Sequence, residues 1–314
     1  MLGMQRRRNC LPQLPAKGSV LKTKRYISPP LVDQRFLRAD FAADIALSQL
    51  RRHLLTFCLT GAIILGSGAP LAAERFGTAD GTPTSPVLVE LFTSEGCSSC
   101  PPADALVERM DSLQPVPGVQ LIVLSEHVDY WNHDGWKDPY SSSSLTDRQS
   151  SYVHALGLKT AYTPQILVDG DMELRANDAQ QISEALQKAG TNPKVPIRIT
   201  SATVDANPTA VRGHVEADGS SMKHNADIYA VIALDHAESQ VSSGENRGRH
   251  LTHVAVVLEI AKVGKLEKGK PFSRDFQVKY KLPQTNSTPI RVVAVIQEPG
   301  SGKVLGAALQ KLTN

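Results

Sequence analysis

The sequence predicts an α/β protein in which a β-α-β-α-β-β-α core, residues 85–191, precedes a β-rich, sandwich-like unit, residues 195–312. Three observations lead to this division. Short apolar runs alternate with segments of helical periodicity up to residue 190. Beyond residue 195 the helical segments stop, and apolar and polar residues alternate as they do in strands. Two cysteines, Cys97 and Cys100, lie between the first predicted strand and the first predicted helix.

Composition indicates an ordinary globular protein and argues against nucleic-acid binding. The chain has 314 residues, of which 41% are hydrophobic and 21% charged. Its net charge of +3 comes from the front of the chain, because residues 1–73 hold 11 Lys/Arg and only 3 Asp/Glu. The remainder is therefore mildly acidic, so the overall basic balance does not indicate a nucleic-acid partner.

Residues 51–73 have the pattern of a signal peptide. Two arginines precede an apolar stretch, which ends in a small-residue cleavage site near Ala73. The apolar stretch is shorter than the roughly 20 residues that span a bilayer, although a membrane anchor is the alternative. Residues 1–50 are expected to be a non-structured extension or to follow from a wrongly assigned start. We expect a bacterial protein exported to the periplasm or secreted, with no stable membrane span after cleavage.

The core elements follow in order. Strands are expected at residues 87–92, 119–124 and 165–168, and a return strand at 172–175 follows the hairpin signal Asp169-Gly170. One helix begins just after the cysteines, a second begins at a capping box at residues 144–147, and Asp178 caps a third. This order is that of a thioredoxin-like core, with the CxxC at the start of its first helix.

The CxxC predicts a reversible disulfide between Cys97 and Cys100. The unpaired N–H groups at a helix N-terminus favour a thiolate, so Cys97 is expected at the cap as the attacking group and Cys100 as the resolving one. Pro101 and Pro102 would then fall at about the fourth and fifth helical positions and disturb the helix. A static disulfide and half of a zinc site are the alternatives.

Pro164 is the second part of the expected site. It directly precedes a predicted strand, and with the CxxC and this element order we expect the Thr163–Pro164 bond to be cis. It would shape a peptide groove beside the dithiol, with Thr163 as an accessory residue. A trans proline that begins a strand is the alternative.

Residues 125–140 follow the carboxyl end of a predicted parallel strand, where α/β sheets place their ligands. We expect His127, Asp129 and Trp131, together with Glu95, to be substrate-binding or accessory residues. His127 would move protons or bind a metal with the two thiolates. The alternative is an ordered loop held by Trp packing and Asp side-chain turns.

Several motifs resemble a family of uncharacterised bacterial secreted proteins, domain of unknown function 1223. They are residues 90–104 around the CxxC, 127–131, 135–139, 162–165 and 244–249. The resemblance covers about residues 85–312 and implies a thioredoxin-like fold and export, but no reaction. Ordinary thioredoxins have a Trp before the first cysteine and a buried acid six residues before it. Here those positions are Gly96 and Leu91, and Glu90 is one place off.

The alternating pattern of the second half predicts strands at residues 196–204, 210–216, 226–234, 252–259, 272–280 and 290–297. A loop at residues 244–250 carries Glu245, Arg247 and Arg249. These would either bind a carboxylate or clamp the loop at a domain interface.

Together these features predict an exported thiol–disulfide oxidoreductase of unknown substrate that uses no cofactor. Its partners would be protein or small-molecule thiols and disulfides. One alternative is a secreted binding module with a structural disulfide. A further alternative is a copper-handling protein that uses Cys97, Cys100 and His127.

Overall fold

The computed structural model describes residues 84–206, 209–282 and 288–312. The expected signal peptide and N-terminal extension, residues 1–73, lie outside the described residues. The first half contains four strands and three helices in the expected order. They are β1 (Ser85–Thr93), α2 (Pro101–Leu113), β2 (Val119–His127), α3 (Ser143–Ala155), β3 (Gln165–Val168), β4 (Met172–Arg175) and α4 (Ala179–Thr191).

The second half consists of strands throughout the part that is described. They are β5 (Ile197–Ala206), β6 (Thr209–Asp218), β7 (Ala226–Gln240), β8 (His250–Leu266), β9 (Pro271–Lys279), β10 (Ile290–Gln297) and β11 (Val304–Leu312). The sequence did not predict β11, because its Ala- and Gly-containing run has little of the β-branched content typical of strands.

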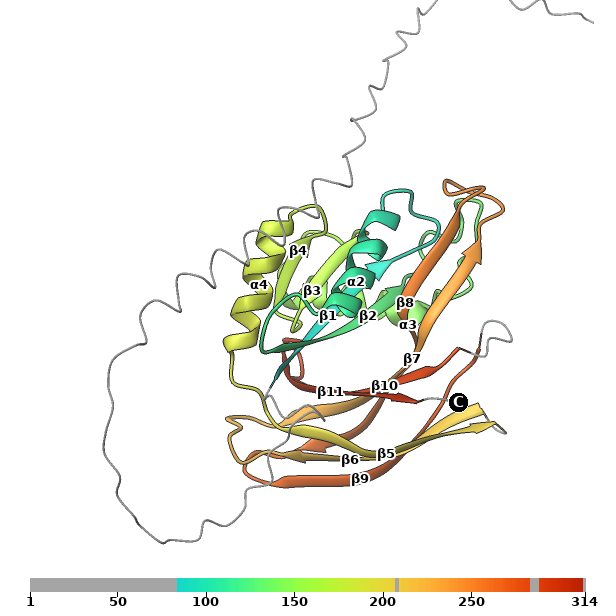
Figure 1. Cartoon of the computed structure of the whole chain (residues 1–314). Coiled ribbons are helices and arrows are strands. Elements are labelled where there is room, and N and C mark those ends of the chain that lie inside the picture. Colours follow the sequence, from blue (N-terminus) through green and yellow to red (C-terminus); the bar gives the residue numbers. More distant parts are fainter. Residues whose placement is uncertain (1–83, 207–208, 283–287, 313–314) are drawn as a thin grey trace, which may run out of the picture. The chain divides into compact units, whose positions relative to one another are not determined.

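Two sheets organise these strands, and the larger one draws on both halves of the chain. The eight-stranded sheet has the order β11-β10-β7-β8-β2-β1-β3-β4, and the smaller sheet has the order β5-β6-β9. β1 and β2 are parallel, and β2 meets β8 in parallel through Ser125 and Val256. The fold is therefore mixed α/β, with a large mixed sheet and a second sheet beside it (Figure 1).

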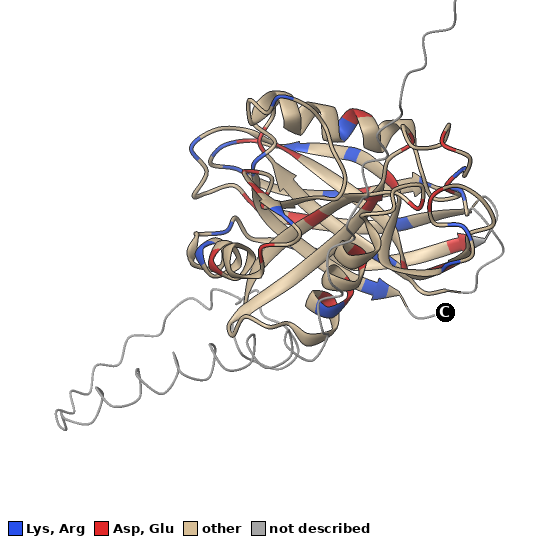
Figure 2. Ribbon diagram, turned by 90° about the horizontal axis from the view of Figure 1, so that it is seen from above, with Lys and Arg blue, Asp and Glu red and all other residues tan. Residues whose placement is uncertain are grey.

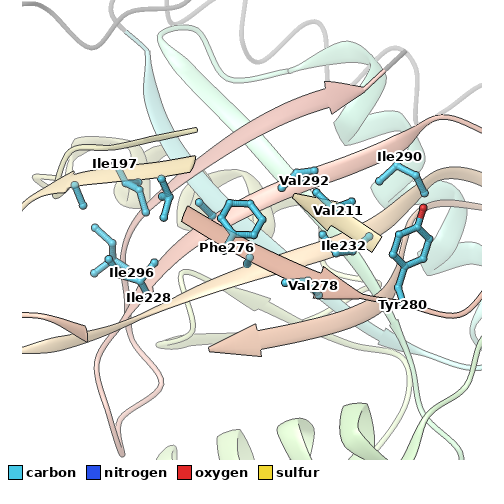
Figure 3. Close-up of a cluster of buried hydrophobic side chains, with 14 of the residues drawn as sticks. Ile197, Val211, Ile228, Ile232, Phe276, Val278, Tyr280, Ile290, Val292 and Ile296 are labelled. Atoms are coloured by element: carbon cyan, nitrogen blue, oxygen red, sulfur yellow. The ribbon is translucent and has the colours of Figure 1, made fainter. Parts of the chain in front are cut away.

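Of the four apolar clusters among the described residues, three hold these layers together. Side chains of α2 and α4 pack with β1, β2 and β3 on one face of the large sheet, whereas Leu145 of α3 packs with Leu88 and Leu124 on the other. The third core lies between the small sheet and the C-terminal strands of the large one. Figure 3 shows Phe276 and Val278 of β9 facing apolar residues of β7 and β10.

Helix termini differ from two expectations and agree with a third. α2 begins at Pro101 with Cys100 as its N-cap, so the prolines occupy the first two helical positions rather than the fourth and fifth. Proline is favoured there because its missing N–H would be unpaired anyway, and the helix is not disturbed. α3 is capped by Ser142, two residues before the expected Ser144. Asp178 caps α4 by accepting from Gln181 N at 2.9 Å, as predicted.

Charged residues of both signs are interspersed over the described elements (Figure 2). This pattern fits the mildly acidic balance of the chain after residue 73. Within the described ranges, no helix combines the length and apolar character that a bilayer crossing requires.

Candidate functional site

Cys97 and Cys100 form a disulfide in a turn that directly precedes α2. Their Cα atoms are 5.5 Å apart, and Cys100 N donates to Cys97 O at 3.2 Å. Both cysteines are fully buried, whereas Ser98 and Ser99 between them are exposed. The Ser99 hydroxyl lies 3.3 Å from the sulfur of Cys97.

The helix cap is Cys100, not Cys97 as the sequence suggested. The reason is that proline cannot donate the N–H groups of a continuous helix, so the helix begins only at Pro101. The N–H groups of Ala103 and Asp104 donate to the carbonyl oxygen of Cys100 at 2.8 and 3.1 Å. The field of the helix N-terminus therefore acts most directly on Cys100.

Trp131 connects the cysteine turn to the proline loop. The Thr163–Pro164 peptide bond is cis, as expected. The indole N–H of Trp131 donates to the Thr163 hydroxyl at 2.8 Å. A Cβ placed on Gly96 would lie 2.9 Å from the Cβ of Trp131. Gly96 thus leaves room for an aromatic side chain supplied by the loop after β2.

The Glu95 carboxylate is buried beside the disulfide turn. Its Oε2 accepts from the indole N–H of Trp136 at 2.7 Å, and its Oε1 lies 3.4 Å from Nε2 of His253. His253, on β8, is also buried, and its Nδ1 lies 3.6 Å from Oδ1 of Asp104 on α2. Glu95, Asp104 and His253 therefore form one buried ionisable cluster.

His127 adjoins this cluster. Its Nδ1 is 2.8 Å from Oδ2 of Asp138, and its ring meets that of His253 edge-on at 4.6 Å between centroids. Asp138 also accepts from the backbone N–H groups of Glu95 and Tyr140, each at 2.9 Å. Burial raises the pKa of Asp138, but His127 and these N–H donors outweigh burial and hold it below its usual value.

Asp129 lies outside this cluster. Its Oδ1 accepts from the Thr146 hydroxyl at 2.6 Å, and its backbone N–H donates to the hydroxyl oxygen of Thr146 at 3.1 Å. These bonds join the loop after β2 to the first turns of α3. Asp129 is thus placed to order the loop.

The segment between β7 and β8, residues 241–249, covers the cysteine turn. We call it the tip loop. Asn246 is fully buried, and its side-chain N–H donates to the carbonyl oxygens of Glu95 at 2.8 Å and Cys97 at 3.0 Å. The Glu245 carboxylate accepts from Ser98 N at 3.1 Å. The loop is therefore a clamp, but Glu245 and Asn246 hold it, while Arg247 and Arg249 are exposed.

Four buried residues of the site were not predicted: Asp104, Asp138, Asn246 and His253. Asp104, Asp138 and Asn246 belong to the sequence motifs at residues 90–104, 135–139 and 244–249, which were the available signal. Asp104 looked like an ordinary first-turn acid of a helix, and His253 looked like one polar position of an alternating strand. Across residues 84–312, apart from the undescribed gaps, no group of three or more His, Cys, Asp or Glu side chains is arranged to hold a metal ion.

Glu90 belongs to a different cluster. It is buried and accepts from Arg148 Nε at 2.9 Å and from the Tyr152 hydroxyl at 2.7 Å, both on α3. Glu126 of β2 lies beside it, 3.3 Å from Arg148 Nε. Glu90 therefore faces α3, whereas its neighbour Leu91 packs in the core that includes α2.

The fold and the site define a mixed α/β protein with a buried CxxC disulfide at the start of a helix. The chain belongs to the family described as protein of unknown function (DUF1223), whose model matches residues 88–297. This confirms the resemblance inferred from the motifs. No curated protein matches the chain.

Solved structures show where the fold recurs. A crystal structure of a protein from Agrobacterium tumefaciens is 24% identical, with a TM-score of 0.55, and the match covers 74% of this chain and 98% of that one. HBP35 of Porphyromonas gingivalis is 14% identical, with a TM-score of 0.48, over 73% of this chain and 76% of that one. The first supports a shared fold over nearly its whole length, and the second is too dissimilar to support an argument.

Proposed function

We propose that the protein is an exported, thioredoxin-like thiol–disulfide oxidoreductase whose Cys97–Cys100 pair cycles between disulfide and dithiol. The single observation that carries the proposal is the position of this disulfide. It directly precedes α2 and is linked, through Trp131 and Thr163, to the cis peptide at Pro164. The thioredoxin-like assignment is supported by the order of elements from β1 to α4 and by the strand order β2-β1-β3-β4.

The chemistry is an exchange with a substrate dithiol. A substrate thiolate attacks the sulfur of Cys97, the Cys97–Cys100 bond breaks, and Cys100 leaves as a thiolate. The second substrate thiolate then attacks the substrate sulfur of the mixed disulfide and releases Cys97. The substrate loses two electrons as its own disulfide forms, and the cysteine pair gains them. In the other direction, the reduced pair reduces a substrate disulfide.

The test has two parts. The first measures the reduction potential of the Cys97–Cys100 pair by equilibration with glutathione, and a redox-active pair is expected above about −300 mV. The second treats the reduced Cys100→Ala variant with oxidised glutathione, and Cys97 should hold one glutathionyl group as a stable mixed disulfide. Cys97→Ala is the matched control, and should capture it more slowly, because the Ser99 hydroxyl lies 3.3 Å from the sulfur of Cys97 and can stabilise a thiolate there.

A potential as low as that of structural disulfides, below about −300 mV, combined with no capture by either variant, would sink the proposal. Capture by both variants at equal rates would instead remove the assignment of Cys97 as the attacking residue.

A second candidate is a secreted binding module in which the disulfide is structural. The burial of both cysteines beneath the tip loop favours it, because a redox-active sulfur needs access. In this case Cys97→Ser lowers stability by about 2–4 kcal/mol but leaves binding unchanged. The reduction potential separates the two candidates.

A further inference from the structure

The Glu95–His253–Asp104 cluster places one imidazole between two buried carboxylates. The distances are 3.4 Å to Glu95 and 3.6 Å to Asp104, and all three side chains are at least nine-tenths buried. These separations suit ion pairs better than hydrogen bonds. Burying three ionisable groups together is costly, so their presence calls for a role beyond packing.

The cluster leaves an unusual number of polar atoms without hydrogen bonds. Both ring nitrogens of His253, one oxygen each of Glu95 and Asp104, and Nε2 of His127 have no hydrogen-bond partner among the described protein groups. Native proteins leave few buried polar atoms unpaired, and each such atom calls for an explanation, such as a redox or catalytic role or a bound water or ion. Five such atoms belong to this cluster and the adjoining His127.

The cluster flanks the disulfide on both sides in sequence. Glu95 is two residues before Cys97, and the side-chain amide of Asn246 donates to the backbone carbonyl oxygens of both residues. Asp104 is one helical turn after Cys100, and its N–H donates to the Cys100 carbonyl at 3.1 Å. The two carboxylates of the cluster therefore belong to residues whose backbones are tied to those of Cys97 and Cys100.

The surroundings favour a protonated imidazole. Burial lowers the pKa of His253, but the carboxylates of Asp104 and then Glu95 outweigh burial and raise it to about 10. The other ionisable groups near His253 are His127 with its partner Asp138, the Tyr140 ring at 6.2 Å, and His250 on the same strand. His253 thus carries a proton at neutral pH.

A cavity gives this proton a route to solvent. It has a volume of about 180 Å³ and is lined by residues of the start of α2 and of β8, among them Pro101, Asp104, His250 and His253. That is room for several waters, and its polar lining offers them partners. The imidazole can therefore be recharged without opening the core.

We propose that this cluster is the proton reservoir of the dithiol, with His253 giving up a proton when the disulfide is reduced and recovering it through the cavity. The proposal rests on the proposed function. When a small dithiol such as dithiothreitol reduces the pair, Cys100 leaves as a thiolate and takes the proton that His253 held. Glu95 and Asp104 are positioning residues that hold the imidazole. Cys100 is fully buried, and burial disfavours a thiolate, which opposes the stabilisation from the helix N-terminus and favours the transfer.

The test compares the rate at which dithiothreitol reduces the folded full-length protein, over a range of pH, in wild type, His253→Gln and His250→Gln. His250 lines the same cavity but contacts neither carboxylate, so its variant is the matched control. His253→Gln should lower the rate at least about tenfold and remove one inflection from the pH profile. His250→Gln should keep the wild-type rate and the wild-type pH profile. Added imidazole should restore part of the rate to His253→Ala.

A wild-type rate and profile in His253→Gln would overturn the proposal while leaving the oxidoreductase intact. A uniform loss at every pH with no rescue by imidazole would reduce His253 to a structural role. A wild-type protein that is not reduced at all while folded would remove the proposed function and this inference together. If His253→Gln fails to fold, the NMR titration of His253 in wild type decides: its pKa must differ between the oxidised and reduced protein, and equal values refute the proposal.

Discussion

The side-chain amide of Asn246 donates to the carbonyl oxygen of Cys97 at 3.0 Å, although 149 positions separate the two residues in the chain. The same amide donates to Glu95, the residue two before Cys97. One side chain of the tip loop therefore fixes the backbone on which the disulfide is built. We therefore expect access to the sulfurs to depend on this contact.

Replacing Asn246 with alanine should open the site. Asn246→Ala removes a donor from two buried carbonyl groups, of which that of Cys97 keeps only the N–H of Cys100, and the loss costs about 1–3 kcal/mol. We expect reduction of the native disulfide by a water-soluble phosphine to accelerate about tenfold or more, since 1.4 kcal/mol corresponds to a factor of ten. Arg247→Ala, at the exposed neighbouring position, should leave the rate unchanged. Equal rates in both variants would show that the tip loop does not control access.

Gly96→Ala should disturb the contact between the cysteine turn and Trp131. The added Cβ would meet the Trp131 Cβ at 2.9 Å, so one of the two backbones must move. We expect the free energy of unfolding to fall by about 1–3 kcal/mol, as in other overpacked sites. Urea denaturation measures it, with Ser98→Ala as the exposed control. A loss no larger than the control's would mean that the loop carrying Trp131 yields easily.

Stability should fall as pH rises through the range in which His253 titrates. Its pKa in the folded protein is raised to about 10, whereas an unfolded histidine titrates near about 6.5. The folded state therefore binds this proton more tightly, and its contribution is complete below pH ~6.5 and disappears by pH ~10. Urea denaturation across this range should show the decline in wild type and a flatter dependence in His253→Gln. Parallel curves for the two proteins would contradict the assignment.

Glu126 predicts a pH effect of its own. Burial, together with the nearby Glu90, raises its pKa well above the usual value, despite the opposing charge of Arg148. A carboxyl with a raised pKa stabilises the folded state at low pH and loses this contribution as pH rises through its folded pKa. Glu126→Gln keeps the shape without the titration, so it should be at least as stable as wild type at neutral pH.

The contrasting variant is Arg148→Met, which leaves the buried Glu90 without its cation. It should lower the free energy of unfolding by about 3–5 kcal/mol. Thermal or urea unfolding separates the two, and a Glu126→Gln protein as unstable as Arg148→Met would show that Glu126 is ionised in the native state.

Local features of the fold were predictable because neighbouring residues determine them. Asp169 and Gly170 have positive φ, 48° and 69°, in the three-residue connection between β3 and β4, as the two central residues of a type I′ turn do. The buried face of α4 consists of Ile182, Ala185, Leu186 and Ala189, the positions its periodicity indicated. The cis bond at Pro164 could be inferred only from the combination of proline, CxxC and element order.

Long-range placement was not predictable in the same way. β8 joins the first half of the chain through a single pair, Ser125 with Val256, and no local pattern specifies such a contact. That junction is what brings His253 beside Glu95 and Asp104. Glu95 and His127 were identified from their closeness in sequence to the CxxC and to a strand end, whereas His253 resembled any polar residue of an alternating strand.

The sequence distance between Asn246 and Cys97 also has a consequence for how the molecule is made. A chain that emerges with its N-terminus first presents both cysteines long before the tip loop exists, and N-terminal regions generally fold first. Oxidation can therefore take place on an open precursor. The later arrival of the β7–β8 hairpin then encloses a bond that has already formed. The order of synthesis thus separates the moment of cross-linking from the moment of enclosure.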